Sequence, residues 1–169
     1  MSEYVTTNWQ DEVRRLNPCG DAMIWLSRRL DAATAWRECP RGDWMLWLLG
    51  RCSGPPESES RRRLVLAACD CADLALPFAR GVNAGEAVRV ARGWAMQDGT
   101  TLEQVRDAAA ADAAAAAAAY AYAANAAADA AAAYAAYAAA AARIKALSRC
   151  ADIVRKHYPN PPVKNERCR

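Results

Sequence analysis

Apolar residues recur at intervals of three and four along the first hundred positions, and short runs of Gly, Pro, Ser, Asn and Asp separate the repeats. This period is typical of amphipathic helices, whereas the punctuation typical of strands does not recur. The separating residues predict five helices, over 17–30, 31–39, 42–50, 58–76 and 83–99. We therefore expect an all-α protein.

Individual residues set the expected helix ends. Asn17 is expected as an N-cap with Pro18 at the first helical position, and Leu30 falls on the apolar face of that helix. Asp31 is expected to cap the next helix. Two capping boxes are also predicted, at Asn83 with Glu86 and at Thr100 with Glu103.

The helix over 42–50 is expected to belong to the core. Trp44, Trp47 and Leu48 share one face of it, and Gly50 is expected to end it. We therefore predict that both tryptophans are largely buried.

A block of alanine dominates the second half of the chain. Residues 108–142 hold 28 alanines in 35 positions, and alanine has the highest intrinsic helix propensity. A single straight helix of about 56 residues, over 102–157, would be roughly 84 Å long, so we expect a break near Asn125 and two alanine-faced helices that pack together. A membrane span, an ice-binding helix and a projecting coiled coil fit the pattern less well than this internal packing.

These elements predict one compact bundle of six to eight helices with an alanine-rich long-helix pair. The length of 169 residues fits a single domain that needs no metal or disulfide for its core. We divide the chain into a polar N-terminal tail (1–16), an all-helical domain (17–158) and a basic, Pro-containing C-terminal tail (159–169).

Charge is distributed unevenly around a net value of +3. Residues 143–169 hold eight Lys and Arg against two acidic residues, while residues 1–142 hold fourteen against seventeen. A basic end of this kind suits nucleic acid or an acidic protein, and it also suits a helix C-terminus that has no partner.

Seven cysteines raise the question of metal or redox chemistry. Cys69 and Cys71 are turned by about 200° from each other on a regular helix, so they cannot bind one metal ion as a zinc knuckle does. The N-terminal sequence MSEYVTTNWQDEVRR lacks the apolar core of a secretory signal. We expect a cytoplasmic protein with free thiols that pack as small apolar residues, and with no metal, cofactor or membrane span.

Catalytic chemistry has little support in the sequence. The single histidine, His157, lies at the end of the last expected helix, and no nucleophile has a placed partner. We therefore expect a protein that is not an enzyme, with partner-binding residues among the charged edges beside apolar helices. These candidates are Arg41, Asp43, Arg61, Arg62, Arg63, Arg155, Lys156 and His157.

Two segments resemble a known family. AACDCADLALPFARG and AVRVARGWAMQDGTTLEQVRDAAAADAAAA, within residues 64–142, are similar to immunity proteins with an alanine-rich helical body that phages and bacteria encode. The resemblance rests on Cys71, Ala72, Leu76, Pro77, Trp94 and Ala95. It implies a non-catalytic inhibitor that binds a protein, either a toxin that it neutralises or a host defence enzyme that it blocks. A nucleic-acid-binding accessory protein that uses the basic C-terminal end is the alternative.

Overall fold

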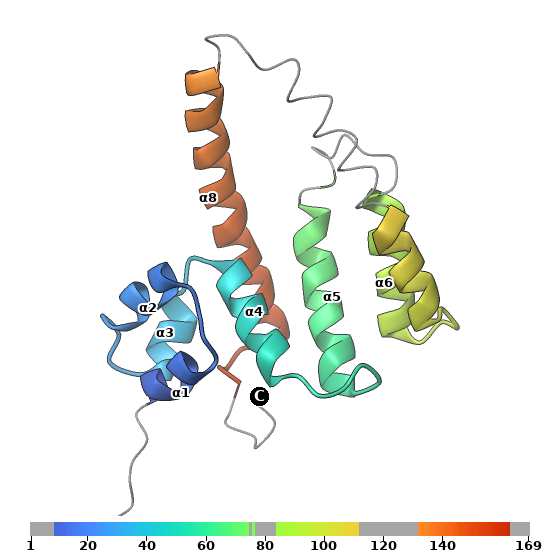
Figure 1. Ribbon diagram of the computed structural model, residues 1–169, viewed down its shortest axis with the longest axis horizontal. Helices are drawn as coiled ribbons and strands as arrows, with labels where there is room; N and C mark the ends of the chain where they lie inside the picture. The colour runs from blue at the N-terminus through green and yellow to red at the C-terminus, as the bar shows by residue number, and fades with distance from the viewer. Residues whose placement is uncertain (1–8, 75, 77–83, 112–131, 163–169) are drawn as a thin grey trace, which may run out of the picture.

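Every regular element in the described part of the chain is a helix (Figure 1). The computed structural model describes residues 9–74, 76, 84–111 and 132–162, with side chains except those of 132–141. The helices are α1 (Trp9–Arg15), α2 (Gly20–Leu26), α3 (Ala32–Glu38), α4 (Gly42–Cys52), α5 (Glu59–Asp73), α6 (Ala84–Met96) and α8 (Ala132–His157). A further helical stretch covers 102–111. The prediction of an all-α bundle is confirmed.

The bundle is built around α5. This helix packs against α8 and α4 on one side and against α6 on the other, and α4 also packs against α8. The short helices α1, α2 and α3 lie together beside α4 (Figure 1). The main core contains Trp36, Cys39, Met45, Leu49, Leu64, Cys71, Ala151 and Val154.

The closest approach between helices is made by small residues of α4 and α8. Gly42 is buried at the start of α4. A Cβ atom at this position would lie 2.4 Å from Cys150 Cβ and 2.6 Å from the Ala151 nitrogen. Only glycine therefore fits at this crossing.

This crossing fixes which face of α4 is buried. Gly42, Met45 and Leu49 lie on the buried face of α4. Trp44 is partly buried and packs against the core, whereas Trp47 is 36% exposed. The prediction of a largely buried ring is therefore wrong for Trp47, because this residue lies on the apolar face of α4 that is turned away from α8.

The two described ends of the alanine-rich region differ in how much they pack against the rest of the bundle. The C-terminal part of α8 packs in the core, where Ala151 and Val154 are fully buried, whereas residues 142–146 are exposed at every position. In Figure 1, α8 accordingly extends beyond the other helices. The stretch 102–111 lies against α6, with which it shares a small surface pocket. The expected break at Asn125 lies outside the described residues.

The first helix boundaries differ from the sequence prediction. Helix α1 lies within 1–16, the stretch assigned to a polar tail. Asn17 is not an N-cap: it adopts a left-handed φ of 59° just after α1, and Cys19 occupies the N-cap of α2. Since α2 ends at Leu26, Leu30 is 95% exposed rather than part of an apolar face.

Other helix ends follow the predicted caps more closely. Asp31 caps α3 as predicted, accepting a hydrogen bond of 2.7 Å from the Thr34 nitrogen. The capping box predicted at Thr100 lies one residue later, where Thr101 and Gln104 exchange side-chain to backbone hydrogen bonds of 2.8 and 3.2 Å. Within the described residues, no helix has the length and apolarity required to cross a membrane.

Candidate functional site

Five of the six tryptophans line one partly open groove of about 640 Å³. The groove lies between α1, α2, α3 and α4, and residues 160–162 form part of its wall. We call it the Trp groove after its rings, Trp9, Trp25, Trp36, Trp44 and Trp47. Its lining is mostly apolar, and its volume is typical of a binding site.

Each short helix positions one or two of these rings. Trp36 is the most buried, at 5% exposure, and its indole Nε1 donates a hydrogen bond of 2.8 Å to the carbonyl oxygen of Tyr158. This bond joins α3 to the segment that follows α8. The floor of the groove is thus fixed by a buried ring, whereas Trp47 remains partly exposed.

Two arginines hold Trp25 and Trp44 in place. The two indole rings lie 6.3 Å apart at an interplanar angle of 60°. The Arg29 guanidinium lies 4.5 Å from the Trp25 ring centroid, and that of Arg41 lies 4.4 Å from the Trp44 centroid. Cation–π contacts of this kind stabilise an exposed pair by about 0.5–1 kcal/mol.

Carboxylates neutralise both of these arginines. Arg29 pairs with Glu38 at 2.7 Å and Arg41 pairs with Asp43 at 2.6 Å. The hydrogen bonds from Arg41 hold the pKa of Asp43 below its ordinary value. Of the candidate residues predicted from sequence, Arg41 and Asp43 therefore lie beside the Trp groove.

The three consecutive arginines stabilise local structure instead. Arg61 donates hydrogen bonds of 3.1 and 3.2 Å to the carbonyl oxygen of Gly54, and Arg62 donates to the backbone carbonyl of Glu57. The guanidinium of Arg63 lies 5.0 Å from the Tyr158 ring centroid. The cluster thus holds the proline-containing loop and the segment after α8.

The C-terminal candidates also separate into different environments. Arg155 donates to the carbonyl oxygens of Cys39 (2.9 Å) and Trp36 (3.3 Å), so it caps the C-terminal end of α3. Lys156 is exposed. His157 Nε2 lies 2.7 Å from Asp70 Oδ2 on α5. The structure does not bring the eight predicted residues together on one surface.

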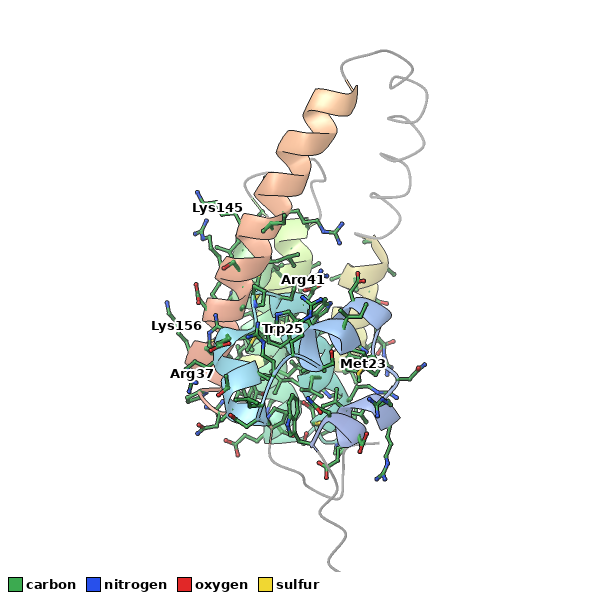
Figure 2. The ribbon with its side chains drawn as sticks, turned by 90° about the vertical axis from the view of Figure 1, so that its left-hand side faces the viewer. Met23, Trp25, Arg37, Arg41, Lys145 and Lys156 are labelled. Carbon is green, nitrogen blue, oxygen red and sulfur yellow. The ribbon has the colours of Figure 1, made fainter. Side chains whose placement is uncertain are left out.

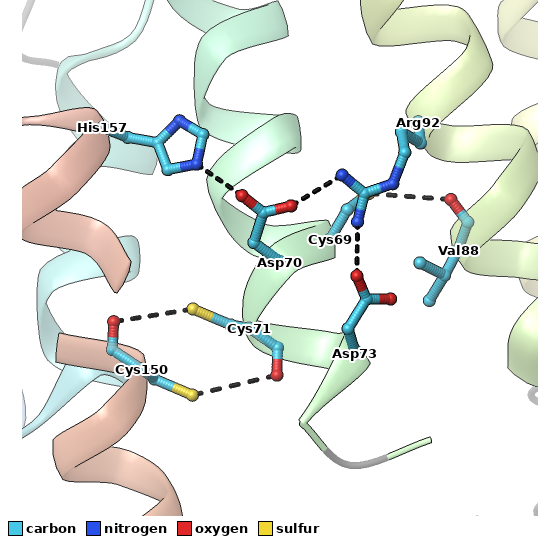
Figure 3. Close-up of polar contacts among 8 residues, drawn as sticks. All are labelled: Cys69, Asp70, Cys71, Asp73, Val88, Arg92, Cys150 and His157. Carbon is cyan, nitrogen blue, oxygen red and sulfur yellow. Dashed lines mark hydrogen bonds and ion pairs between the residues drawn. The ribbon is translucent and has the colours of Figure 1, made fainter. Parts of the chain in front are cut away.

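A polar cluster that the sequence did not reveal joins three helices (Figure 3). Besides His157, Asp70 accepts a 2.6 Å hydrogen bond from Arg92 on α6, and Arg92 also pairs with Asp73 at 2.7 Å. Burial alone would raise the pKa of Asp70, but the hydrogen bonds from Arg92 and His157 outweigh it and hold the pKa below its ordinary value. The cluster links α5 to α6 and α8.

Cys69 and Cys71 pack against different helices (Figure 3). The Cys69 thiol lies 3.7 Å from the carbonyl oxygen of Val88 on α6, and the Cys71 thiol lies 3.6 Å from that of Cys150 on α8. Burial raises the pKa of both thiols, that of Cys71 to about 12. The two sulfur atoms therefore face different neighbours, as the helical spacing predicts.

One cysteine differs from the prediction of free thiols throughout. Cys52, which lines the Trp groove, is disulfide-bonded. Free thiols are found at Cys19, Cys39, Cys69, Cys71 and Cys150. In the described part of the chain, no three His, Cys, Asp or Glu side chains are arranged to hold a metal ion.

No family model, curated protein or solved structure matches this chain. The resemblance to immunity proteins therefore stays a prediction from the sequence.

Proposed function

We propose that this protein is a non-catalytic inhibitor that binds another protein through the Trp groove. The observation that carries the proposal is the gathering of five indole rings, two of them in contact with arginine, on one partly open surface. Tryptophan and arginine dominate the binding energy of protein interfaces, especially in pockets that a partner can desolvate. The sequence resemblance suggests a toxin or a host defence enzyme as the partner.

The polar cluster around Asp70 supports a structural rather than a catalytic role for His157. Both oxygens of the Asp70 carboxylate are occupied, one by His157 and the other by Arg92. Among the described residues, no serine, threonine or cysteine is hydrogen-bonded to His157. A nucleophile with a placed base is the arrangement that covalent catalysis needs.

A second candidate function rests on the outer face of α8. Lys145, Arg149 and Lys156 lie within about 40° of one another around the helix axis and are all exposed. Figure 2 shows Lys145 and Lys156 pointing away from the bundle on the same side. This basic ridge, defined by these three residues, favours an anionic partner such as nucleic acid, although exposed Asp152, which pairs with Arg155, lies on the same face.

Affinity capture with surface variants distinguishes the two functions. The full chain, Trp47→Ala, a Lys145→Ala/Arg149→Ala/Lys156→Ala ridge variant and a Trp94→Ala control are used as baits in extracts of cells that carry the gene. Trp47 is the most exposed ring of the groove, so its removal should leave the fold intact, and Trp94 lies on α6 away from the groove.

We expect the full chain to capture one protein in stoichiometric amount, and we expect this capture to survive nuclease treatment. Its capture should fall about tenfold with Trp47→Ala, as at an interface hot spot, and should persist with the ridge variant and with Trp94→Ala. Capture that nuclease abolishes and that the ridge variant loses would contradict the proposal and favour nucleic-acid binding.

A further inference from the structure

The protein's own C-terminal segment shows what kind of chain the Trp groove accommodates. The segment Tyr158-Pro159-Asn160-Pro161-Pro162 follows α8, and its last three residues form part of the groove wall. The carbonyl group of Tyr158, directly before Pro159, accepts the 2.8 Å hydrogen bond from the indole nitrogen of Trp36. An indole ring of the groove thus already contacts a proline-containing segment through a backbone carbonyl.

A proline-rich segment has specific requirements for its binding site. Residues before proline favour extended conformations, and a polyproline II helix forms no internal hydrogen bonds. Its carbonyl oxygens therefore need donors from outside, whereas its prolines have no N–H group to satisfy. A suitable groove offers flat apolar rings and hydrogen-bond donors, with few acceptors.

The Trp groove has this composition. Four of its indole N–H groups, those of Trp9, Trp25, Trp44 and Trp47, have no hydrogen-bond partner in the part of the chain that the structure describes. Indole nitrogen is a donor only. Glu12 and Arg15 are the charged side chains in the lining, and the remaining lining is almost entirely apolar.

We infer that the Trp groove binds an extended, proline-rich segment of a partner protein, an inference that rests on the proposed protein-binding function. The volume of about 640 Å³ is the space left with Pro161 and Pro162 already in the wall. Aromatic-lined grooves recognise proline-rich segments because the preformed extended conformation loses little entropy on binding. A β-strand would need acceptors for its N–H groups, and a helix would offer no free carbonyl groups along its face.

Decaproline is the direct probe of this site. Intrinsic tryptophan fluorescence reports binding to the full chain, because five of its six tryptophans line the groove. We expect a saturable change with decaproline and none with a (Gly-Ser)5 peptide of the same length. Absence of a saturable change, or an equal response to both peptides, would overturn the inference.

Variants of Trp47 distinguish the contribution of its ring face to binding from the contribution of its N–H group. Trp47→Ala should weaken decaproline binding about tenfold, and Trp47→Phe, which keeps a ring but loses the donor, should fall in between. Trp94→Phe, outside the groove, should bind as the unmodified chain does. Circular dichroism establishes that each variant is folded. Decaproline affinity that is equal in Trp47→Ala and the unmodified chain would assign the peptide to another surface.

Failure of this inference is distinguishable from failure of the proposed function. If the captured partner depends on Trp47 but decaproline does not bind, the groove binds protein by another mode, such as an apolar helix, and the inference is wrong. If decaproline binds in the groove but no stoichiometric partner is captured, the specificity of the groove for proline-rich segments stands and the inhibitor function falls.

Discussion

Gly42 is the residue at which a single added carbon has the clearest predicted effect. A Cβ at this position would meet the backbone of α8 at Ala151 as well as Cys150 Cβ, and neither helix can move aside without disturbing the core. We expect Gly42→Ala to lower the free energy of unfolding by about 1–3 kcal/mol, the usual cost of overpacking. Chemical denaturation measures the change.

Gly50, in the same helix, is the matched control. A Cβ there would have one neighbour, Leu64 Cδ2, at 3.9 Å, which is ordinary van der Waals contact. Gly50→Ala should therefore stabilise the protein by about 0.4–1 kcal/mol through the helix propensity of alanine and a less flexible unfolded chain. Equal effects of the two substitutions would show that α4 and α8 do not cross as closely as described.

The free cysteines should differ sharply in reactivity. Cys71 is buried, and burial raises the pKa of its thiol well above the ordinary value, so little of the reactive thiolate form is present at pH 8. Cys19 is exposed. We expect an alkylating reagent to label Cys19 in the folded protein and to reach Cys69 and Cys71 only on unfolding. Mass spectrometry of peptides measures this order, and rapid labelling of Cys71 would contradict its packing against α8.

Helix caps show how far the sequence predicts structure at single residues. Asp31 was predicted because its side chain matches the need of a helix N-terminus and little else competes at that position. The N-cap predicted at Asn17 is wrong, because asparagine is equally suited to the left-handed conformation that follows α1. Thr100 and Thr101 are both acceptable caps, and the turn after α6 decides between them.

Among the elements, α4 illustrates why the buried face was assigned incorrectly. Both faces of the helix are apolar: one carries Met45 and Leu49, and the other carries Trp44 and Trp47. Helical periodicity places residues on faces but does not rank two apolar faces. Gly42 determines which face is buried, because it lets α8 approach that side of α4. The burial of this face therefore depends on a helix about a hundred residues away in the chain.

The link between α5, α6 and α8 predicts an acid-dependent stability. Asp70 has a lower pKa in the folded chain than its ordinary value of 3.8, so the unfolded chain binds more protons as pH falls through this range. The contribution is present above about pH 4 and is lost as pH falls towards the folded pKa. Asp70→Asn should cost about 1 kcal/mol at neutral pH, as partly exposed ion pairs do, and should reduce the loss of stability on acidification.

Denaturation at a series of pH values between 2 and 7 tests this prediction. The unmodified chain and Asp70→Asn should converge in stability at the acidic end, where the carboxyl group is protonated in both the folded and the unfolded chain. Asp11→Asn, which removes an exposed pair within α1, is the control and should change the pH profile little. A constant difference between Asp70→Asn and the unmodified chain at every pH would contradict the role of Asp70.

For the whole molecule, the bundle was predictable and the binding groove was not. Helical spacing, caps and alanine content are local features, and they sufficed for an all-α bundle. The Trp groove draws its rings from four helices and part of its wall from residues 160–162, so no single stretch of sequence contains its pattern. Trp25 and Trp44 are 19 positions apart in the chain, yet their rings lie 6.3 Å apart.

The arginines predicted as partner-binding residues also depend on contacts between segments that are far apart in the chain. A run of arginines in sequence indicates an exposed cluster, but guanidinium groups also serve backbone carbonyl oxygens that end helices and loops. Arg61 and Arg155 both do so, at Gly54 and at Cys39. Their replacement should therefore affect stability before it affects binding.

Amide hydrogen exchange of the protein with and without its captured partner tests the central claim most directly. If the partner occupies the Trp groove, peptides from α2 to α4 should gain protection, while residues 142–149 of α8 should exchange unchanged. Trp47→Ala should abolish that gain at equal partner concentration. Protection confined to α8, with α2 to α4 unchanged, would contradict the assignment of the Trp groove as the site at which this protein binds its partner.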